Sequence, residues 1–401
     1  MTVWKSATIG QVSLVVTKGT TPTSVGRGFK LSGIPFVKVE SIKGNGFIDP
    51  RKTAYIDEET HGQLSRSALQ VDDILFTIAG TIGRVAQVTS PLVPGNTNQA
   101  VAVIRPDRRV VEPRFALYCL RDERRIQRAH SRVVQSVQAN LSLSELRSVE
   151  IPLPPLHEQK AICSVLGALD DKIAVNEGIA TTADALSRAF HQRALIDSVE
   201  KRVRIGKIAQ IVVGGTPSRS KPEYWTGGTV NWINSGKANE FRVIEPSETI
   251  TEEALAASSV KMMPPGATLI GITGATMGKI SRLEIPAGGS QNVAGVWSDD
   301  TALNDWLFHE IRARVADLTK HASGGAQQHI NKRIIMELEC AVPRPERLAE
   351  WSARTSPLVK LTAERLVENR VLGTLRDTLL PQLVSGRLRV KDAEKIVEDA
   401  T

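Results

Sequence analysis

The stretch IPLPPLHEQKAI (residues 151–162) joins a run of prolines directly to a long segment whose apolar residues recur with a helical period. Proline has no backbone N–H and disfavours helical angles in the residue before it. The sequence therefore predicts an extended IPLPP segment and a helix that begins at its last proline. A second elbow of this kind, AVPRPERLAEW, occupies residues 341–351.

The two elbows belong to an internal repeat that extends over most of the chain. Each half begins with a β-rich run that ends in Gly-Thr and a Thr-Pro turn, and later segments match in the same order. The matched pairs are ATIGQVSLVVTKGTTPTS and VRIGKIAQIVVGGTPSRS, GIPFVKVESIKGNGFI and GTVNWINSGKANEFRVI, ILFTIAGTIGRVAQV and TLIGITGATMGKISRL, and NQAVAVI and QNVAGVW.

Short, mainly apolar runs bounded by Gly, Pro, Asn and Asp predict that each half is a β-rich globular domain followed by a long helix. The predicted fold class is α+β, with two pseudo-repeated β-rich domains joined by two long helices. The predicted segments are 1–154 for the first domain, 155–198 for a central helix, 199–345 for the second domain, 346–390 for a C-terminal helix and 391–401 for a tail.

Both long helices carry an apolar stripe with the three-and-four spacing of a coiled coil. Each helix would pack on its own domain in one interpretation, but equivalent elbows and one asparagine in each stripe favour pairing of the two helices. A two-fold relation between the halves requires an antiparallel pair, and 40 residues span about 60 Å. The predicted seam contains Ile162, Leu166, Leu169, Ile173 and Asn176 in the first helix and Leu358, Leu366, Asn369, Leu372, Leu379 and Leu383 in the second.

Charge, cysteine and histidine content, and the lack of long apolar runs limit which classes of protein this chain can belong to. A formal net charge of +8 suggests a polyanionic partner. The three cysteines, Cys119, Cys163 and Cys340, are isolated, and the seven histidines show no metal-ligand spacing, so neither a disulfide framework nor a metal site is predicted. Without a leader segment or a membrane-length apolar run, the sequence predicts a cytoplasmic protein.

Glycine-rich turns recur at equivalent places, AGTIGR at residues 79–84 and TGATMGK at 273–279. Each ends in a cation after small residues that allow backbone amides to approach a phosphate. An ordinary tight strand connection explains either turn alone, and neither has the spacing of a nucleotide-binding loop.

Arginines recur at steps of four, three and four in Arg121, Arg125, Arg128 and Arg132. On a helix predicted from Phe115 to Arg132 they would form one cationic face suited to tracking phosphates. The alternative is an ordinary solvated face.

Polar side chains able to pair with base edges also cluster in both halves. Loop amides more often cap the backbone than read bases, and the aromatic residues of PEYW (residues 222–225) more often fill a core than stack on a ligand. The candidate DNA-binding residues are Lys18, Thr20, Lys38, Lys43, Gly80, Thr81, Gly83, Arg84, Gln99, Arg121, Arg125, Arg128, Arg132, Gln135, Gln138, Asn140, Thr216, Arg219, Lys221, Tyr224, Lys237, Gly274, Thr276, Lys279, Gln291, Asn292, Gln327, Gln328, His329 and Asn331.

With these motifs the chain resembles, over essentially its whole length, the specificity subunit of type I restriction-modification enzymes. The resemblance is carried by LSELRSVEIPLPPLHEQKAI in the centre, GGTPSRSKPEYWTGGTVNWINSGK at the start of the second half and LRDTLLPQLVSGRLRV near the end. Two segments depart from the family pattern: VPRPERLAEW replaces a second PLPPLHEQ, and KGTTPTS stands where the fuller motif has Gly-Gly-Thr-Pro.

The resemblance implies that each domain is a target-recognition domain that reads half of a split target in double-stranded DNA. It also implies that the two helices pair antiparallel, separate the domains and dock two methyltransferase subunits. Restriction and translocase subunits would join through the complex. S-adenosylmethionine, ATP and Mg²⁺ are expected on partner subunits and no cofactor on this chain.

A non-catalytic role fits the absence of an N/D-P-P-Y/F motif from the sequence. One alternative is a stand-alone nuclease in which Asp72, Asp73 or Asp107 binds Mg²⁺. Another is a protein-binding scaffold with incidental positive charge. Salt dependence discriminates between a DNA reader and a scaffold, because phosphate contacts release counterions.

Overall fold

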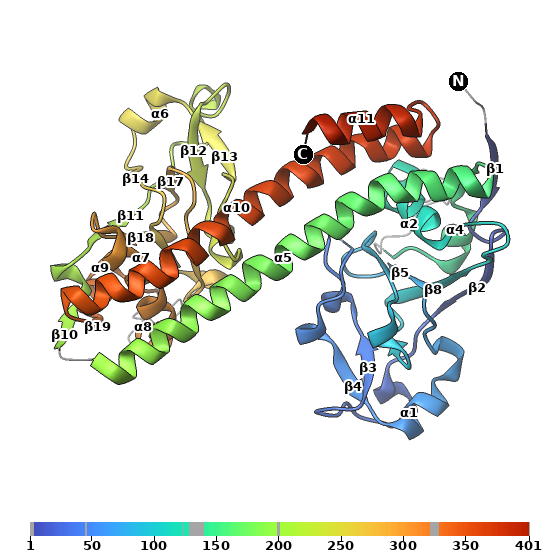
Figure 1. The fold of residues 1–401 in the computed structure, drawn as a ribbon, viewed down its shortest axis with the longest axis horizontal. Helices are drawn as coiled ribbons and strands as arrows, with labels where there is room; N and C mark the ends of the chain where they lie inside the picture. Colours follow the sequence, from blue (N-terminus) through green and yellow to red (C-terminus); the bar gives the residue numbers. More distant parts are fainter. Residues whose placement is uncertain are drawn as a thin grey trace. The chain divides into compact units, whose positions relative to one another are not determined.

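The computed structural model groups the chain into two compact units, Met1–Asp171 with Leu372–Thr401, and Lys172–Val371 (Figure 1). The boundary between the units crosses two long helices, α5 (Leu156–Ser198) and α10 (Pro345–Val384). The structure describes residues 4–44, 46–122, 124–127, 140–198, 201–320 and 329–400.

Within the described ranges, the first domain contains three sheets. A two-stranded antiparallel sheet pairs β1 (Lys5–Thr8) with β9 (Glu150–Leu153). The four-stranded antiparallel sheet has the order β2 (Ser13–Lys18), β8 (Val101–Pro106), β5 (Ile74–Thr77) and β6 (Val85–Gln87). The third sheet has the order β4 (Ala54–Ile56), β3 (Ile34–Val37) and β7 (Asn96–Thr97), with β3 and β7 parallel.

The second domain repeats this topology strand for strand and adds one short strand. Its two-stranded sheet pairs β10 (Lys201–Arg204) with β19 (Glu339–Val342). Its four-stranded sheet has the order β11 (Gln210–Val213), β18 (Val293–Trp297), β15 (Thr268–Gly271) and β16 (Ile280–Arg282). Its third sheet has the order β13 (Glu248–Ile250), β12 (Val230–Ile233), β17 (Ala287–Gly289) and the added β14 (Met262–Met263). The predicted duplication is therefore confirmed.

Short helices also recur in equivalent places. Ser142 and Glu145 form a capping box at the start of α4, and the Asn331 side chain caps α9 in the second domain. Among the described residues of the first domain, the bounded short α-helices are α1 (Glu58–Gln63), α2 (Pro113–Arg121) and α4 (Leu143–Ser148). The second contains α6 (Glu252–Ala256), α7 (Thr301–Ala313), α8 (Val315–Lys320) and α9 (Lys332–Glu337).

The four-stranded sheet of the second domain is covered on both faces. One face packs against α7 and α9 through Ile270, Val296, Leu307, Ile311 and Ile335. Residues from its other face pack with residues of the third sheet, in a cluster that includes Ile233, Met263, Leu269, Leu283 and Val293. Burial on both faces explains why β15 and β18 read as continuous apolar runs.

The long helices α5 and α10 pack against each other in antiparallel orientation, as predicted (Figure 1). In the second unit, the amide of Asn369 donates to the carbonyl of Ile173 at 3.1 Å. Further along, Trp351 packs in one cluster with Phe190 and Ala194. Rising residue numbers in α5 thus meet falling numbers in α10.

The predicted seam residues of α5 are all buried, whereas those of α10 are buried only in part. Leu372, Leu379 and Leu383 are buried, and Leu358 and Leu366 are half-buried. Two threonines that the leucine stripe does not reveal, Thr355 and Thr362, are fully buried. Each donates its hydroxyl to the carbonyl four residues earlier, which satisfies the polar group inside the helix pair.

The prediction of one helix from Phe115 to Arg132 is wrong. Helix α2 ends at Arg121, and Asp122 has extended backbone angles of φ −76° and ψ 96°. The carboxylate of Asp122 accepts the backbone N–H of Arg124 at 3.2 Å. Aspartate competes with the helix by bonding nearby backbone in this way, which interrupts the predicted helix between Arg121 and Arg125. Residues 124–127 are helical again, and Arg128 and Arg132 lie outside the described residues.

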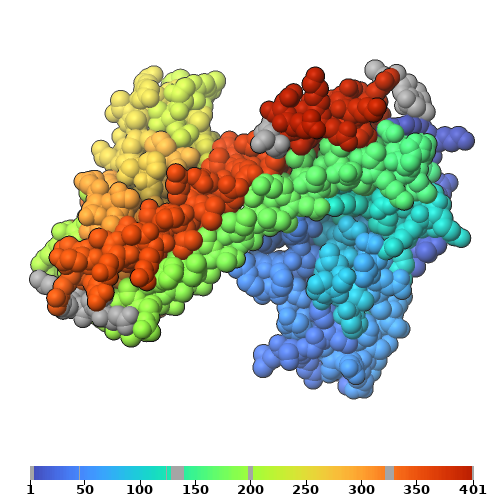
Figure 2. Space-filling model, in the orientation of Figure 1, coloured from blue at the N-terminus to red at the C-terminus, as the bar shows by residue number. Residues whose placement is uncertain are grey.

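The C-terminal region also differs from the predicted helix to 390 and tail from 391. Helix α10 ends at Val384 because Gly386 takes a positive φ of 72° and Arg387 donates to the Gln382 carbonyl, an arrangement that closes a helix terminus. The chain then forms α11 (Val390–Ala400), which lies against the end of α10 (Figures 1 and 2). Ala393 is fully buried there.

Within the described residues, no helix is both long enough and apolar enough to cross a lipid bilayer.

Candidate nucleic-acid interface

Several of the candidate residues of the first domain meet at one end of its four-stranded sheet. Neighbouring strands are antiparallel, so the end of β2 at Lys18 lies beside the start of β8 and the end of β5. Lys38 joins them because it follows β3, which runs parallel to β7 just before β8. We call residues 18–21, 38, 79–84 and 98–100 the first loop end.

The second domain builds the same arrangement from the equivalent strands. The end of β11 lies beside the start of β18 and the end of β15, and the backbone of Thr273 bridges to that of His329. We call residues 214–221, 273–279 and 290–292 the second loop end.

A glycine at the start of each loop end allows two backbone segments to touch. The N–H of Gly19 donates to the Val101 carbonyl at 3.2 Å, and that of Gly214 donates to the Val293 carbonyl at 3.0 Å. A Cβ atom on Gly19 would lie 1.9 Å from the Thr97 carbonyl oxygen, so no other residue fits there. A glycine at this position of each repeat is thus a structural requirement.

The residues after these glycines make an equivalent contact in both domains. Thr21 donates its hydroxyl to Gln99 in the first, and Thr216 donates its hydroxyl to Gln291 in the second. The candidate glutamines Gln99 and Gln291 remain exposed while their amide oxygens are held by threonine. The pairing orients each amide at the surface.

The two glycine-rich turns are tight strand connections with positive φ angles at equivalent glycines. These angles are 73° at Gly80, 91° at Gly83, 58° at Gly274 and 76° at Gly278. Their cations differ, because Arg84 donates to the Ile42 carbonyl at 2.8 Å and is half-buried.

The remaining turn residues vary in exposure. Lys279 and Thr81 are exposed and Thr276 is half-buried.

The other candidate cations near the loop ends differ in their exposure. Lys18 and Lys221 are exposed, as is Arg219, which pairs with Glu248. Lys43 and Thr20 are half-buried.

Three candidate residues serve the interior instead of a loop end. Tyr224 is 6% exposed and belongs to an apolar cluster, so it is a core residue. Lys237 is 9% exposed, with its ammonium nitrogen 2.8 Å from Glu240. Arg121 lies 2.9 Å from the buried carboxylate of Asp170 in α5. Each of these side chains has the chemistry of a DNA contact, but the sequence alone does not reveal that it is turned into the interior.

Of the remaining candidate DNA-binding residues, some lie within the described residues and some lie outside them. Arg125 lies 3.3 Å from Asp122 and is half-buried. Asn140 and His329 are exposed, and Asn292 is half-buried. The candidates Arg128, Arg132, Gln135, Gln138, Gln327 and Gln328 lie outside the described residues.

The sequence reasoning missed two residues that contact the first loop end. Arg66 donates to the Thr20 hydroxyl at 3.3 Å although it is far away in the sequence. Phe29 is 40% exposed and lies under the ammonium group of Lys38 at 4.3 Å. A single phenylalanine in a loop carries no pattern that would distinguish it from a core residue.

The aspartates of the nuclease alternative are each held by an arginine. Asp73 is buried and lies 2.7 Å from Arg105, Asp107 lies 2.8 Å from Arg109, and Asp72 pairs with Arg108. Across the described ranges, no three histidine, cysteine or acidic residues are placed to hold a metal ion. The nuclease alternative has no support.

Buried charges attach each domain to the long helices within its own unit. In the first unit, Asp170 of α5 accepts the Tyr118 hydroxyl at 2.9 Å and lies 2.8 Å from Arg376 of α10. Burial alone would raise the pKa of Asp170, but Arg121, Arg376 and the hydroxyl outweigh burial and lower it.

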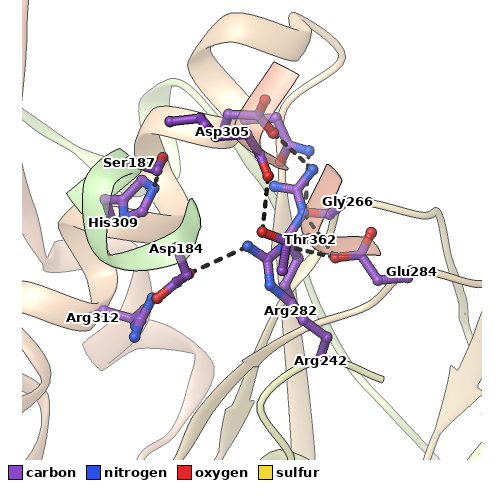
Figure 3. Close-up of polar contacts among 12 residues, drawn as sticks. Asp184, Ser187, Arg242, Gly266, Arg282, Glu284, Asp305, His309, Arg312 and Thr362 are labelled. Atoms are coloured by element: carbon purple, nitrogen blue, oxygen red, sulfur yellow. Dashed lines mark hydrogen bonds and ion pairs between the residues drawn. The ribbon is translucent and has the colours of Figure 1, made fainter. Parts of the chain in front are cut away.

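The second unit holds a larger cluster on α5 (Figure 3). Asp184 lies 3.0 Å from Arg312 and 3.3 Å from Arg242. Arg242 continues to Glu284 at 2.7 Å. The cluster is completed by Arg282, which lies 2.7 Å from Asp305. Three carboxylates therefore balance three guanidinium groups, as buried charges require.

Two copies of one β-rich domain, each with a polar loop end and each anchored to an antiparallel helix pair, define a tandem binding protein. The family model described as type I restriction modification DNA specificity domain matches residues 1–183 and 199–350. The chain belongs to this family.

Curated relatives and one solved structure agree with this assignment. The chain is 20% identical to the type I restriction enzyme HindI specificity subunit of Haemophilus influenzae, over 97% of this chain and 100% of that protein. It is 24% identical to the EcoR124I/EcoR124II specificity subunit of Escherichia coli over 50% of this chain, a match that spans about half (53%) of that relative. A type I restriction-modification S subunit from M. genitalium has the same fold, with a TM-score of 0.56, 15% identity and coverage of 95% of this chain and 96% of that one.

Proposed function

We propose that this chain is the sequence-specific DNA-recognition subunit of a type I restriction-modification complex, in which each domain reads one half of a bipartite target through its loop end. The observation that carries the proposal is the duplicated loop end, with the same glycine contact at its start and the same Thr–Gln contact in both domains. Cations at each loop end suit phosphate contacts, and amides suit base edges.

The helix pair suits the role of a spacer between the two half-sites. Helix α5 is continuous over 43 residues and α10 over 40. Buried charges anchor each domain to these helices, and a buried pair resists rearrangement because breaking it leaves an uncompensated charge. We infer that the helices set the gap in the target.

The subunit is non-catalytic, in keeping with its family. Two methyltransferase subunits would dock on the paired helices, and restriction and translocase subunits would join through that complex. These partners would carry S-adenosylmethionine, ATP and Mg²⁺.

A domain exchange tests this function. The chain is co-expressed with its methyltransferase subunits, and the methylated positions in cellular DNA are sequenced. Replacing residues 1–154 by the equivalent domain of a relative is expected to change one half of the methylated sequence and leave the other half intact. A change in both halves contradicts the assignment of one half-site to each domain.

A second measurement distinguishes DNA reading from protein scaffolding. Binding of the assembled complex to a target duplex should weaken steeply with salt, with a slope of roughly −0.9 per phosphate contact in log affinity against log salt. Binding that does not change with salt favours the scaffold.

A further inference from the structure

Both domains contain the same pair of aromatic rings beside the loop end. Phe29 and Phe36 lie seven residues apart, with ring centroids 5.4 Å apart and planes at 70°. Trp225 and Trp232 repeat the spacing, at 5.2 Å and 89°. The inner ring is buried in each pair, whereas Phe29 is exposed and Trp225 is half-buried.

A cation covers the outer ring in both domains. The ammonium group of Lys38 lies 4.3 Å from the centre of the Phe29 ring, and the guanidinium of Arg219 lies 3.5 Å from that of Trp225. Such contacts are attractive because the ring face is electronegative. Each domain therefore places a cation on an aromatic support, from the residue after β3 in the first domain and from the loop between β11 and β12 in the second.

The support in the second domain is fixed to the loop end. The indole N–H of Trp225 donates to the Ser218 carbonyl at 3.2 Å, and that of Trp232 donates to the Gly215 carbonyl at 3.1 Å. Arg219 is in the same segment of chain. Its guanidinium is thus held by stacking on a braced ring, which reduces the freedom it would lose on binding.

The carboxylate of Glu248 fixes the orientation of the exposed Arg219 guanidinium. Its two terminal nitrogens donate to the two oxygens of Glu248 at 2.8 and 2.7 Å. The pair is more than two-fifths exposed on both sides, so it is weakly stabilising and open to competition from a ligand.

The two acceptors of Glu248 resemble the O6 and N7 atoms of guanine, which an arginine fork binds in the major groove. Lys38 has no fork and carries a point charge 3.8 Å from Glu40, which suits a phosphate and no particular base.

We propose that Arg219, stacked on Trp225, reads one guanine in the second half-site by exchanging Glu248 for the guanine edge, and that Lys38 on Phe29 contacts a phosphate in the first. This inference rests on the proposed function and specifies one base that the second domain recognises. It makes the two half-sites chemically unequal, because one domain presents a guanidinium on its aromatic support and the other an ammonium group.

The test uses the complex with its methyltransferase subunits and a set of duplexes. Each duplex carries the methylated target found by sequencing, with one base pair substituted. In R219K, which keeps the charge and loses the fork, we expect discrimination to fall by roughly 5- to 150-fold at one G·C pair of one half-site and to persist elsewhere.

K38Q is the matched control in the other domain. It is expected to weaken binding to all duplexes equally and to reduce the salt slope by about one contact, without changing any base preference. A uniform loss in R219K, or full retention of discrimination at every position, would overturn the proposal for Arg219.

E248Q provides a second variant that leaves the arginine intact. Removal of the competing charge should raise affinity for the full target and preserve discrimination at the same G·C pair. Lower affinity would show that Glu248 itself contributes to binding and would also overturn the exchange. Loss of sequence preference by the unaltered complex would instead contradict the proposed function.

Discussion

Replacing Asp184 by asparagine removes one charge from the centre of the buried cluster while keeping the shape of the side chain. Asp184 is 5% exposed and holds Arg242, which is 3% exposed, and Arg312, whose side chain is 25% exposed. After the change Arg242 keeps Glu284, but the cluster retains three guanidinium groups and only two carboxylates.

The expected cost follows from this imbalance. Removing one partner of a buried pair typically costs about 3–5 kcal/mol. Water reaches Arg312 in part, so we expect about 3 kcal/mol for D184N. For a unit of roughly 200 residues this lowers the Tm by roughly 6–12 °C.

Tryptophan fluorescence reports on the affected unit, because five of the six tryptophans lie within Lys172–Val371. D317N is the control, since Asp317 is half exposed and lies 4.0 Å from an arginine that also has Glu310. It should change stability by less than about 0.5 kcal/mol. If D184N unfolds at the same temperature as D317N, the buried charges do not hold the domain on α5.

Further predictions concern pH and backbone space. Burial, followed by the neighbouring His191 and nearby arginines, lowers the pKa of His309 to about 2, so the folded state keeps it neutral. The stability that neutral His309 contributes is complete above the unfolded pKa of about 6.5 and is lost at about 1.4 kcal/mol per pH unit as the pH falls towards 2. H309Q should therefore flatten the dependence of unfolding free energy on pH, measured by fluorescence. An unchanged slope would refute the role of His309 in this pH dependence. G214A should strongly destabilise the second domain in urea unfolding, because its Cβ would lie 2.0 Å from a carbonyl oxygen. G178A, in open space on α5, should stabilise by roughly 0.5–1 kcal/mol; similar effects of the two changes would contradict the packing described.

Features that depend on the spacing and order of residues along the chain were predictable from the sequence. The repeat, the proline elbows and the antiparallel helix pair depend on spacing and backbone chemistry, which a sequence states directly. The loop ends follow from them, since the repeat places equivalent turns after equivalent strands.

Features that depend on distant neighbours were not predictable. Arg121 looked like one of four phosphate contacts, but Asp122 ends its helix and Asp170 takes its charge. Tyr224 looked available until the packing of the domain buried it. Thr355 and Thr362 are buried in α10 although they interrupt its leucine stripe. Burial is tolerated because each hydroxyl donates to a backbone carbonyl of the same helix.

The spacer role has the most direct test in the gap between half-sites. One heptad inserted at facing positions of α5 and α10 lengthens the pair by about 10 Å, which corresponds to about three base pairs of DNA. Sequencing of the DNA methylated by this complex should show both half-sites unchanged and the gap longer by about three base pairs, or no methylation at all while both domains remain folded. Methylation of the original target with its original gap would contradict the account.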